Sequence, residues 1–591
     1  MNSNYTYSKR NLEFLLFEVF KIQDLKKYSY FANIDEETIK GILDLSENIA
    51  EKYLRPYFKA TDLMPASWHD GKVYVHPAIK TYYQAYVSQG LMAATFDATF
   101  GGFHMPKSVY ASGDFIIGNA HNGIEMFTAL THSGAELLLS FASEELIERY
   151  VPGLLNGSLA ATMCLTEPQA GSSLQEITTF ATLQEGNYKI KGQKIFISAG
   201  DHDITQNIIH LVLAKTTKQP NKISLFAVPK YKDDLQTRND VQSIGIYHKM
   251  GQKSTPAVHL EFGSNMDCNA YLIGDEGKGL QYMFQMMNTA RLGVGLAGTY
   301  MASAAYYLSL KYANERIQGK RKDEAGTIMP AKIIQHADIR RMLYVQKSIF
   351  EGALSLIQEC NLYLDLLKVV DNKEESDLYQ SLLDLLTPVA KTYGAEKGIE
   401  SISLAMQILG GYGYTEDFNL EQLYRDARIL SIYEGTTGIQ SITLLGRNIL
   451  FTEAKSIQLW KEKVFSELAP SLADYKVREY SELWMAEITR LENILRHLLI
   501  TAKTNSVEFA LKDATVFMEY IGIITIGWQW IKQGIASSKA MDATMPDVDF
   551  YRSKLKTMKF YFQYEWVKVE ALVKILLAKE DLTYQGEYID C

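Results

Sequence analysis

The sequence predicts an α+β protein in which helical segments flank a small β domain. Two observations support this prediction. Apolar residues recur at the spacing of one helical face before about residue 160 and again after about residue 280. Between these segments lie short runs of β-type residues that turn signals separate. The chain shows neither βαβ alternation nor a GxGxxG motif after a strand, so we do not expect a Rossmann nucleotide site.

Residues 1–35 form an N-terminal extension, and residues 36–159 form a mostly helical domain. Asp35 is a suitable N-cap residue, because its carboxylate can accept hydrogen bonds from the first backbone amides of a helix. A glycine-containing loop, Phe100–Pro106, interrupts the helical pattern. The apolar face of the first helix in this domain is expected to comprise Ile39, Ile42, Leu43, Ile49, Ala50, Tyr53 and Leu54.

Residues 160–272 form the predicted β domain. Turn signals occur at Glu185-Gly186-Asn187 and at Gln219-Pro220-Asn221. Between such turns the residues are rich in β-branched and aromatic side chains, which favour strands. Examples of runs with this composition are residues 188–198, 208–217, 223–230 and 257–262.

Helical spacing resumes in residues 273–451 and continues in an extra helical domain, residues 452–591. The longest apolar stretch of this tail, residues 521–531, is far shorter than the roughly 20 residues that a membrane-spanning helix needs. We therefore expect a buried helix there, in a tail that packs onto the helical body or onto a second subunit. A membrane-facing helix is the alternative interpretation.

A chain of 591 residues is too long for one hydrophobic core and should hold three or four packed units. Its formal net charge of -9 offers no general basic surface to nucleic acid or to an anionic membrane. The four cysteines lie far apart and form neither a metal-ligand pair nor a disulfide framework, which fits a reducing compartment. Glu13 and Glu18 interrupt the N-terminal apolar stretch, unlike a signal peptide. We therefore expect a mature start and a cytoplasmic location.

Glu434 is the only charged residue among residues 429–446. A carboxylate among apolar and small polar neighbours loses hydration, which raises its pKa from about 4.3 toward the range of a general base. Gly435 and the two threonines that follow it allow close backbone approach and offer hydroxyl groups to a ligand. A helix-capping or surface carboxylate is the alternative interpretation.

A second candidate site lies in Met163–Ser173 (MCLTEPQAGSS), where small residues and hydroxyls form a turn. The backbone amides of such a turn can reach a flat or anionic ligand, although many such loops are only structural. The segment Lys194–Ser198 strengthens the ligand hypothesis, because a strand places Phe196 and Ser198 on one face. One of them can pack on a ligand and the other can hydrogen-bond to it. By propensity alone, Phe196 is an ordinary strand residue.

With these segments the chain resembles the acyl-CoA dehydrogenase family of flavoproteins. The matching motifs follow the family's order across about residues 40 to 450. The N-terminal lead and the extra helical tail resemble a longer subgroup of the family, which includes 3-methylmercaptopropionyl-CoA dehydrogenases and broad-range fatty acyl-CoA dehydrogenases. The six motifs are MCLTEPQAGSS, GQKIFIS, NTAR (residues 288–291), YANER (312–316), QILGGYGYTED (407–417) and YEGTTGIQ (433–440).

The resemblance implies a helical domain, a β domain and a four-helix domain that enclose FAD. Thr166 and Ser198 would hydrogen-bond to the flavin ring, and Phe196 would pack on it. Further FAD contacts are implied for Ser172 and Thr436. The residues implied to line the acyl-CoA site are Ser172, Asn288, Arg291, Tyr433 and Gly435.

The resemblance also implies an oligomer. Arg316, Gln407 and Gly411 match positions that grip the pyrophosphate and adenosine end of FAD from the neighbouring subunit. A homodimer would follow, or a tetramer built from such dimers. Gly410-Gly411 could instead simply end a helix, since glycine is common just past the last turn.

The implied reaction is the α,β-dehydrogenation of a saturated acyl-CoA to the trans-2-enoyl-CoA, as in fatty acid β-oxidation. Glu434 would take the α-proton, the flavin would take the β-hydride, and an electron-transferring flavoprotein would receive the electrons. The base position that some relatives use instead is Ala290 here, which cannot take a proton. We expect a base that deprotonates carbon to share its pocket with no cation. An acyl-CoA oxidase and a DNA-associated alkylation-response flavoprotein are the alternatives.

Overall fold

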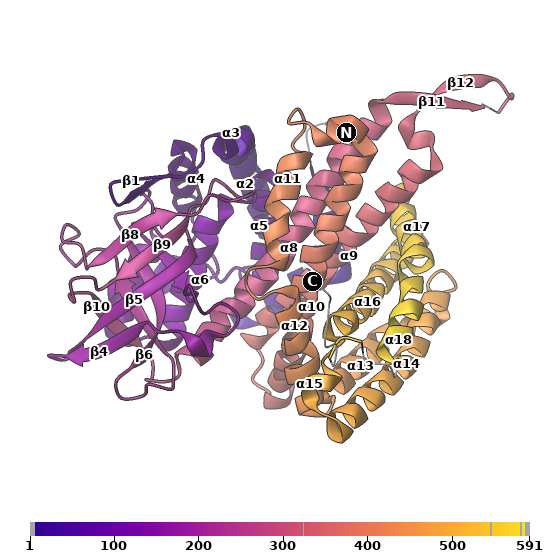
Figure 1. The fold of residues 1–591 in the computed structure, drawn as a ribbon. Coiled ribbons are helices and arrows are strands. Elements are labelled where there is room, and N and C mark those ends of the chain that lie inside the picture. Colours follow the sequence, from indigo (N-terminus) through magenta and orange to yellow (C-terminus); the bar gives the residue numbers. More distant parts are fainter. Residues whose placement is uncertain (1–5, 323, 544–545, 579–581, 585–591) are drawn as a thin grey trace. The chain divides into compact units, whose positions relative to one another are not determined.

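The computed structural model describes residues 6–322, 324–543, 546–578 and 582–584 (Figure 1). The chain divides into two compact units, one formed by Met1–Ala32 with Arg291–Cys591 and the other by Asn33–Ala290. The division falls inside the long helix α8 (Gly279–Glu315). In the described part, Cys164, Cys268 and Cys360 are free and buried, while Cys591 lies outside the described residues.

The second unit, Asn33–Ala290, begins with a helical domain. Its predicted first helix is present, and Asp35 caps it, because the carboxylate accepts a hydrogen bond from the Thr38 amide at 2.8 Å. The small hairpin β1–β2 was not predicted, since each strand has only three residues. The elements of this domain are α2 (Glu36–Ile49), α3 (Phe58–Leu63), β1 (Ser67–His69), β2 (Lys72–Tyr74), α4 (Pro77–Ser88), α5 (Lys107–Ala120), α6 (Glu125–Phe141) and α7 (Glu144–Leu155).

The β domain follows in the same unit, and all four predicted runs are strands in it. The turn signal at Glu185-Gly186 joins β4 to β5, with φ of +50° and +87°, as a tight hairpin requires. Four further strands escaped prediction. The strands are β3 (Leu159–Cys164), β4 (Phe180–Gln184), β5 (Asn187–Ser198), β6 (Asn207–Thr216), β7 (Ser224–Pro229), β8 (Val241–Ile246), β9 (Ala257–Phe262) and β10 (Asn269–Ile273).

These eight strands form one sheet in the order β10-β7-β6-β4-β5-β9-β8, with β3 parallel to β6. Strand β10, which is at one end of this order, also pairs with β5 from within it. The strands β6 and β7 are almost wholly buried, which explains their continuous apolar runs. The core of the domain includes Val212, Phe226, Val258, Leu260 and Phe262.

The first unit is almost entirely helical in its described part. One exception is the two-stranded ribbon of β11 (Ile317–Lys322) and β12 (Ile328–Lys332), which extends away from the helices of its unit (Figure 1). The helices that precede the tail are α1 (Lys9–Glu13), the C-terminal part of α8, α9 (Ala337–Leu367), α10 (Lys373–Leu409), α11 (Leu420–Ala427) and α12 (Thr437–Ile442).

The tail packs onto the helical body, which was the first of the predicted arrangements. The Trp530 indole donates to the carbonyl of Ser348 in α9 at 3.0 Å, and a Cβ atom at Gly352 would lie only 2.6 Å from Ile526. No described helix is long and apolar enough to cross a membrane. The tail helices are α13 (Lys455–Leu468), α14 (Arg478–Thr504), α15 (Val507–Ala510), α16 (Ala514–Asp542), α17 (Val548–Tyr564) and α18 (Val569–Leu576).

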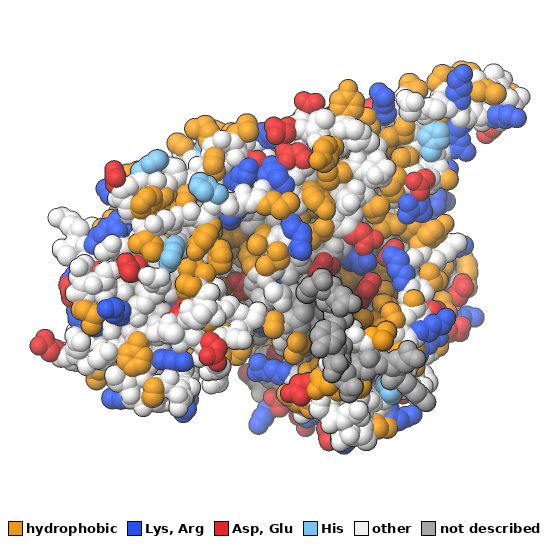
Figure 2. Space-filling model, in the orientation of Figure 1, with side chains coloured by type: hydrophobic (Ala, Val, Ile, Leu, Met, Phe, Trp, Pro, Cys, Tyr) orange, Lys and Arg blue, Asp and Glu red, His pale blue; other side chains and the backbone are white. Residues whose placement is uncertain are grey.

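The N-terminal extension is also packed rather than loose. Lys554 of α17 is buried, and its ammonium donates to the Asn11 side chain and to Glu351 of α9 at 2.9 Å. The extension therefore belongs to the same core as the tail. On the face drawn in Figure 2, basic and acidic side chains are interspersed, as 60 basic and 69 acidic residues allow.

Candidate active site

Glu434 lies in a left-handed turn between two short helices of the first unit. Its φ is +53°, and that of Gly435 is +87°. A non-glycine residue in this region costs on the order of 1 kcal/mol, and such strain is concentrated at functional sites. Gly435 cannot be replaced easily, since its φ lies in the left-handed region, which strains a residue that carries a Cβ atom. The Glu434 side chain is partly accessible to solvent, as a base that meets a substrate must be.

Three side-chain contacts hold this base turn, residues 433–437. The Gln440 amide donates to the carbonyl of Glu434 at 3.0 Å, and the Lys391 ammonium donates to the carbonyl of Gly435 at 2.8 Å. Thr436 caps helix α12, because its hydroxyl accepts from the Ile439 amide at 3.2 Å. The strained backbone is therefore fixed at three successive residues.

Two cations act on Glu434. Burial raises the pKa of Glu434 to about 7, and the charges of Arg291 and Lys391 offset part of that rise. The predicted absence of a cation from the pocket of the base is therefore wrong. The sequence around Glu434 contains none, but the fold brings one from α8 and one from α10. A carboxylate with a pKa near 7 is about half ionised at neutral pH, which suits a general base.

A close crossing of α8 and α10 brings the two cations together. A Cβ atom at Gly295 would lie 2.5 Å from the carbonyl of Ala390, and one at Gly298 would lie 2.0 Å from the carbonyl of Gly394. Only glycine permits this approach of two backbones. Arg291 precedes Gly295 by about one helical turn, so both cations emerge beside the crossing.

Other predicted site residues of this unit lie near two helix ends. Arg316, Gln407 and Gly411 are all exposed. Arg316 follows the last residue of α8, and Gln407 precedes the end of α10. Gly410 ends α10 with φ of +61°, which agrees with a helix-terminating role for that glycine. The ring of Tyr312, one turn before Arg316, contacts the ring of Tyr412 with centroids 6.5 Å apart. The two helix ends are therefore neighbours. The side chains of Arg316 and Gln407 and the backbone of Gly411 are all accessible to an external ligand.

In the β domain, Phe196 occupies a bulge rather than an ordinary strand position. The pairing of β5 with β9 shifts between Lys194 and Ile197, and φ of Phe196 is +58°. Phe196 is 57% exposed, and its ring packs on that of Tyr247 with centroids 4.4 Å apart. The sheet thus presents a large aromatic face outward at the cost of backbone strain.

Two hydroxyl groups lie in the predicted ligand-binding segments, that of Thr166 in Met163–Ser173 and that of Ser198 in Lys194–Ser198 with Phe196. Thr166 and Ser198 are partly exposed, and the part of the chain that the structure describes supplies no hydrogen bond to either hydroxyl. The backbone amide of Ile195 donates to the carbonyl of Thr166 at 2.9 Å, so the two segments lie side by side. Ser172 is exposed on the following loop. An outward aromatic ring beside two available hydroxyls fits a flat, polar-edged ring system such as a flavin.

A buried ion pair holds these segments together. Lys194 donates to Glu167 at 2.8 Å and to the carbonyl of Leu165 at 2.9 Å. Burial opposes ionisation of Glu167, but the charge of Lys194 and hydrogen bonds, including those from Thr178 and Thr179, outweigh it and lower its pKa to about 2. The pair is therefore charged and fixes Thr166 relative to the strand of Phe196.

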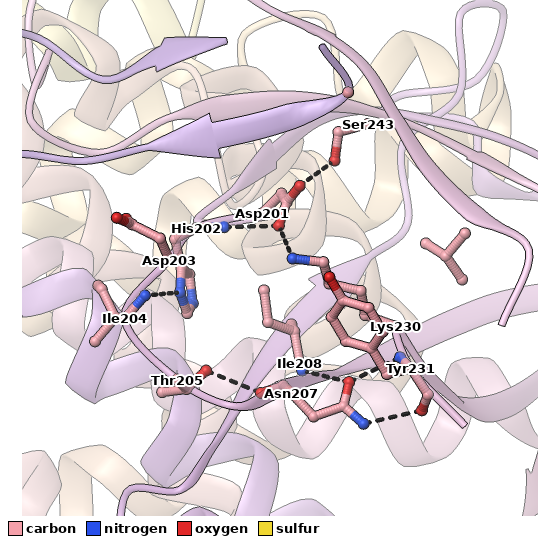
Figure 3. A network of polar contacts seen from close by, with 12 residues as sticks. Asp201, His202, Asp203, Ile204, Thr205, Asn207, Ile208, Lys230, Tyr231 and Ser243 are labelled. Atoms are coloured by element: carbon pink, nitrogen blue, oxygen red, sulfur yellow. Dashed lines mark hydrogen bonds and ion pairs between the residues drawn. The ribbon is translucent and has the colours of Figure 1, made fainter. Parts of the chain in front are cut away.

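A second polar network anchors the loop that follows Ser198 (Figure 3). The Asp201 carboxylate accepts from Lys230 at 2.5 Å and from the Ser243 hydroxyl at 2.6 Å. The Asn207 side chain exchanges hydrogen bonds with the backbone of Tyr231, each at 2.9 Å. The loop after β5 is therefore tied at both of its ends to the residues that follow β7, and it is also tied to β8 through Ser243.

Three family models match this chain. The acyl-CoA dehydrogenase middle domain matches residues 162–264, the acyl-CoA dehydrogenase C-terminal domain matches residues 277–450, and a domain described as acetyl-CoA dehydrogenase C-terminal like matches residues 462–585. A 3-methylmercaptopropionyl-CoA dehydrogenase of Ruegeria pomeroyi is 32% identical over 581 residues, which cover 96% of this chain and 97% of the relative. The chain belongs to the acyl-CoA dehydrogenase family.

A further relative of this acyl-CoA dehydrogenase family member and a solved structure of the same fold each span nearly its whole length. A butyryl-CoA dehydrogenase of Syntrophomonas wolfei is 31% identical over 590 residues, with 95% of each chain covered. A crystal structure of an acyl-CoA dehydrogenase from Bacillus anthracis in complex with FAD shares the fold, with a TM-score of 0.73, 21% identity and coverage of 96% and 93%. The predicted α+β fold with an extra helical domain and the family resemblance are confirmed.

Sequence reasoning missed four residues of these sites: Glu167, Lys194, Lys391 and Gln440. Glu167, Lys194 and Gln440 lie inside recognised motifs, yet their contacts required the fold. Lys391 left a detectable signal, because it is a lone cation in the apolar run LLTPVAKTYGA. A cation in the buried stripe of a helix needs a partner, and that partner is part of the base turn.

Proposed function

We propose that this acyl-CoA dehydrogenase family member oxidises a saturated acyl-CoA thioester to the trans-2-enoyl-CoA, with FAD as cofactor and Glu434 as base. One observation supports the proposal most. Glu434 is a partly accessible carboxylate with a pKa raised to about 7 by burial, and it lies in a strained turn that three side chains hold.

The carboxylate of Glu434 would take the α-proton of the thioester. The α-proton is weakly acidic, so the base must be ionised and yet basic enough to accept it. Burial raises its basicity, while Arg291 and Lys391 keep a useful fraction ionised. The two opposing effects place the pKa near the operating pH.

The backbone amide of Glu434 would stabilise the enolate oxygen that develops as the proton leaves. The described backbone hydrogen bonds do not use this amide, so it is available to a ligand. Fixed donors near a developing oxyanion contribute strongly to catalysis, because no reorganisation is needed in the transition state. The three contacts on the base turn would therefore serve both the carboxylate and the amide.

In the β domain, Phe196 would pack on the isoalloxazine ring, and the hydroxyls of Thr166 and Ser198 would bind its edge. Thr436 and Ser172 are further proposed FAD contacts. When bound, FAD supplies the acceptor for the β-hydride. The exposed Arg316, Gln407 and Gly411 would bind the pyrophosphate and adenosine end of FAD across a homodimer interface. Asn288, Arg291, Tyr433 and Gly435 would line the acyl-CoA site together with Ser172.

An electron-transferring flavoprotein would then receive the electrons. A related caffeyl-CoA reductase subunit of Acetobacterium woodii is named as part of a complex with such a flavoprotein, which supports this choice of acceptor. The names of the full-length relatives favour butyryl-CoA and 3-methylmercaptopropionyl-CoA as the first substrates to try.

The test is Glu434→Gln in the purified FAD-loaded protein. We expect the variant to keep its yellow flavin and to lose anaerobic bleaching by either acyl-CoA by about 10²-fold to 10⁴-fold, the range for removal of a general base. Glu453→Gln, an exposed carboxylate of the same unit, is the matched control and should bleach normally. Bleaching of the Glu434→Gln variant at the wild-type rate would disprove the assignment. Peroxide formation in air without added acceptor would identify an oxidase instead.

A further inference from the structure

Lys391 differs from the other buried lysines of the described chain. Lys194, Lys230 and Lys554 each form an ion pair with a carboxylate, at 2.8, 2.5 and 2.9 Å. Lys391 is 0% exposed, yet within the described residues its ammonium bonds to the carbonyl of Gly435 and to no carboxylate. A buried ammonium without a paired carboxylate is costly, so the fold keeps it for a reason other than stability.

The charge of Lys391 is therefore not cancelled by direct pairing. Burial lowers the pKa of Lys391 to about 8, against the opposing charges of Glu434 and Glu396. Glu396 acts on Lys391 only through its charge, because among the described residues its carboxylate accepts from the Thr437 hydroxyl at 2.5 Å and forms no hydrogen bond with the ammonium. Near neutral pH the lysine is therefore still largely charged and acts on Glu434 through space.

We propose that Lys391 is a positioning residue for Glu434, which holds the left-handed base turn through the carbonyl of Gly435 and supplies an uncancelled positive charge that favours the ionised base. This inference rests on the proposed function, because it concerns the same carboxylate. The glycine crossing makes it possible, since Lys391 follows Ala390, whose carbonyl would touch a Cβ atom at Gly295.

The two roles of Lys391 are separable by substitution. Lys391→Met removes both the bond and the charge, Lys391→Gln keeps a donor without a charge, and Lys391→Arg keeps the charge. The charge of Lys391 lowers the pKa of Glu434, so its loss should raise that pKa, and about 1 unit is the lower end of the typical effect of a neighbouring opposite charge. The charged groups that face Glu434 are Arg291 from α8 and Lys391 from α10, and Arg291 remains in all variants.

The experiment is anaerobic stopped-flow reduction of the FAD-loaded protein by butyryl-CoA from pH 6 to pH 9.5. A rise of about 1 unit from a pKa near 7 cuts the ionised fraction at pH 7 from about one half to about one tenth. We therefore expect Lys391→Met and Lys391→Gln to reduce flavin about fivefold more slowly than wild type at pH 7. Their rates should approach the wild-type rate near pH 9, where the wild-type lysine has also lost its charge. Lys391→Arg should keep the wild-type midpoint.

Lys397→Met is the matched control, because Lys397 lies on the same helix and is paired with Glu400 at 2.7 Å. Its profile should match wild type. The proposal would be overturned if the midpoint of the pH profile were unchanged in both neutral variants. It would also be overturned if Lys391→Arg lost FAD together with the neutral variants, since a lysine with a purely structural role predicts such a general loss of FAD. If Lys391→Met alone fails to fold, the midpoints of Lys391→Gln and Lys391→Arg still decide. Failure of the proposed function is distinguishable, because only then would Glu434→Gln bleach normally.

Discussion

Glu167 and Glu434 are two carboxylates that each lie close to a buried lysine, yet the fold tunes them in opposite directions. Glu167 bonds to Lys194 at 2.8 Å and to backbone amides, and its pKa falls to about 2 despite burial. Glu434 lies near Lys391 but does not bond to it, and burial raises its pKa to about 7. The two sites differ in the acceptor of the lysine ammonium. Lys194 donates to the carboxylate of Glu167, whereas Lys391 donates to the backbone carbonyl of Gly435 beside Glu434.

These two environments distinguish a carboxylate with a structural role, Glu167, from a carboxylate suited to proton transfer, Glu434. A carboxylate that is paired and fully hydrogen-bonded stays ionised and can fix two segments, but it cannot take a proton near neutral pH. A buried carboxylate that lies near cations without bonding to them, such as Glu434, has a pKa near neutral pH and can take up a proton there. Opposite environments for two titratable groups are a usual sign of divided roles.

The largest expected effect is on the structural member of the pair. Glu167→Gln leaves the Lys194 ammonium buried without an ionic partner, which typically costs about 3–5 kcal/mol. We expect that loss in the free energy of unfolding by denaturant at pH 7, together with weaker FAD retention. The contribution of Glu167 is present above about pH 4.5 and is lost as pH falls toward about 2, so the difference between variant and wild type should shrink in acid.

Asp267→Asn is the control for this experiment. Asp267 pairs with Lys189 at 2.6 Å in the same domain, but the carboxylate is largely exposed. An exposed pair of this kind contributes about 1 kcal/mol or less. A Glu167→Gln variant that loses no more stability than Asp267→Asn would show that the buried pair is not structural, and the contrast with Glu434 would fail.

A smaller effect of opposite sign is expected at Glu434. Its pKa in the folded protein is raised from 4.5 to about 7, so the stability associated with the protonated form is fully present below pH 4.5 and is lost as pH rises through 7. Glu434→Gln mimics the protonated form. It should therefore unfold like wild type at pH 4 and be more stable by about 3 kcal/mol at pH 8.5. If variant and wild type were equally stable at both pH values, ionisation of Glu434 would not destabilise the folded protein.

Both glutamates lie in motifs that the sequence alone made recognisable, but only one could be assigned a role from it. Glu434 was predicted from the absence of local charge, and the strands β5, β6, β7 and β9 from their β-branched and aromatic runs. Arg291 belonged to a recognised motif and Lys391 stood out as a lone cation in an apolar run, but their action on Glu434 could not be predicted, because the crossing of α8 and α10 depends on which glycines meet. Strand β3 was missed since its alanines give no β signal, and its parallel pairing with β6 supplies what propensity does not.

The smallest effect tests the strain that the two regions share, because Phe196, with φ of +58°, lies in the same left-handed region as Glu434. Phe196→Gly relieves that backbone strain but adds the chain entropy of glycine, and each amounts to about 1 kcal/mol, so the protein without FAD should lose only the contact of the ring with Tyr247, about 0.5–1.5 kcal/mol. If the exposed ring packs on the flavin, its loss should weaken FAD binding by about 1 kcal/mol, which is about fivefold. Phe196→Trp should keep most of that affinity, because it retains an aromatic face. FAD titration followed by flavin fluorescence measures both. A Phe196→Gly variant with lower stability and unchanged FAD affinity would assign the bulge to the fold of the sheet, and the base turn would then be the only one of the two strained sites that serves the chemistry.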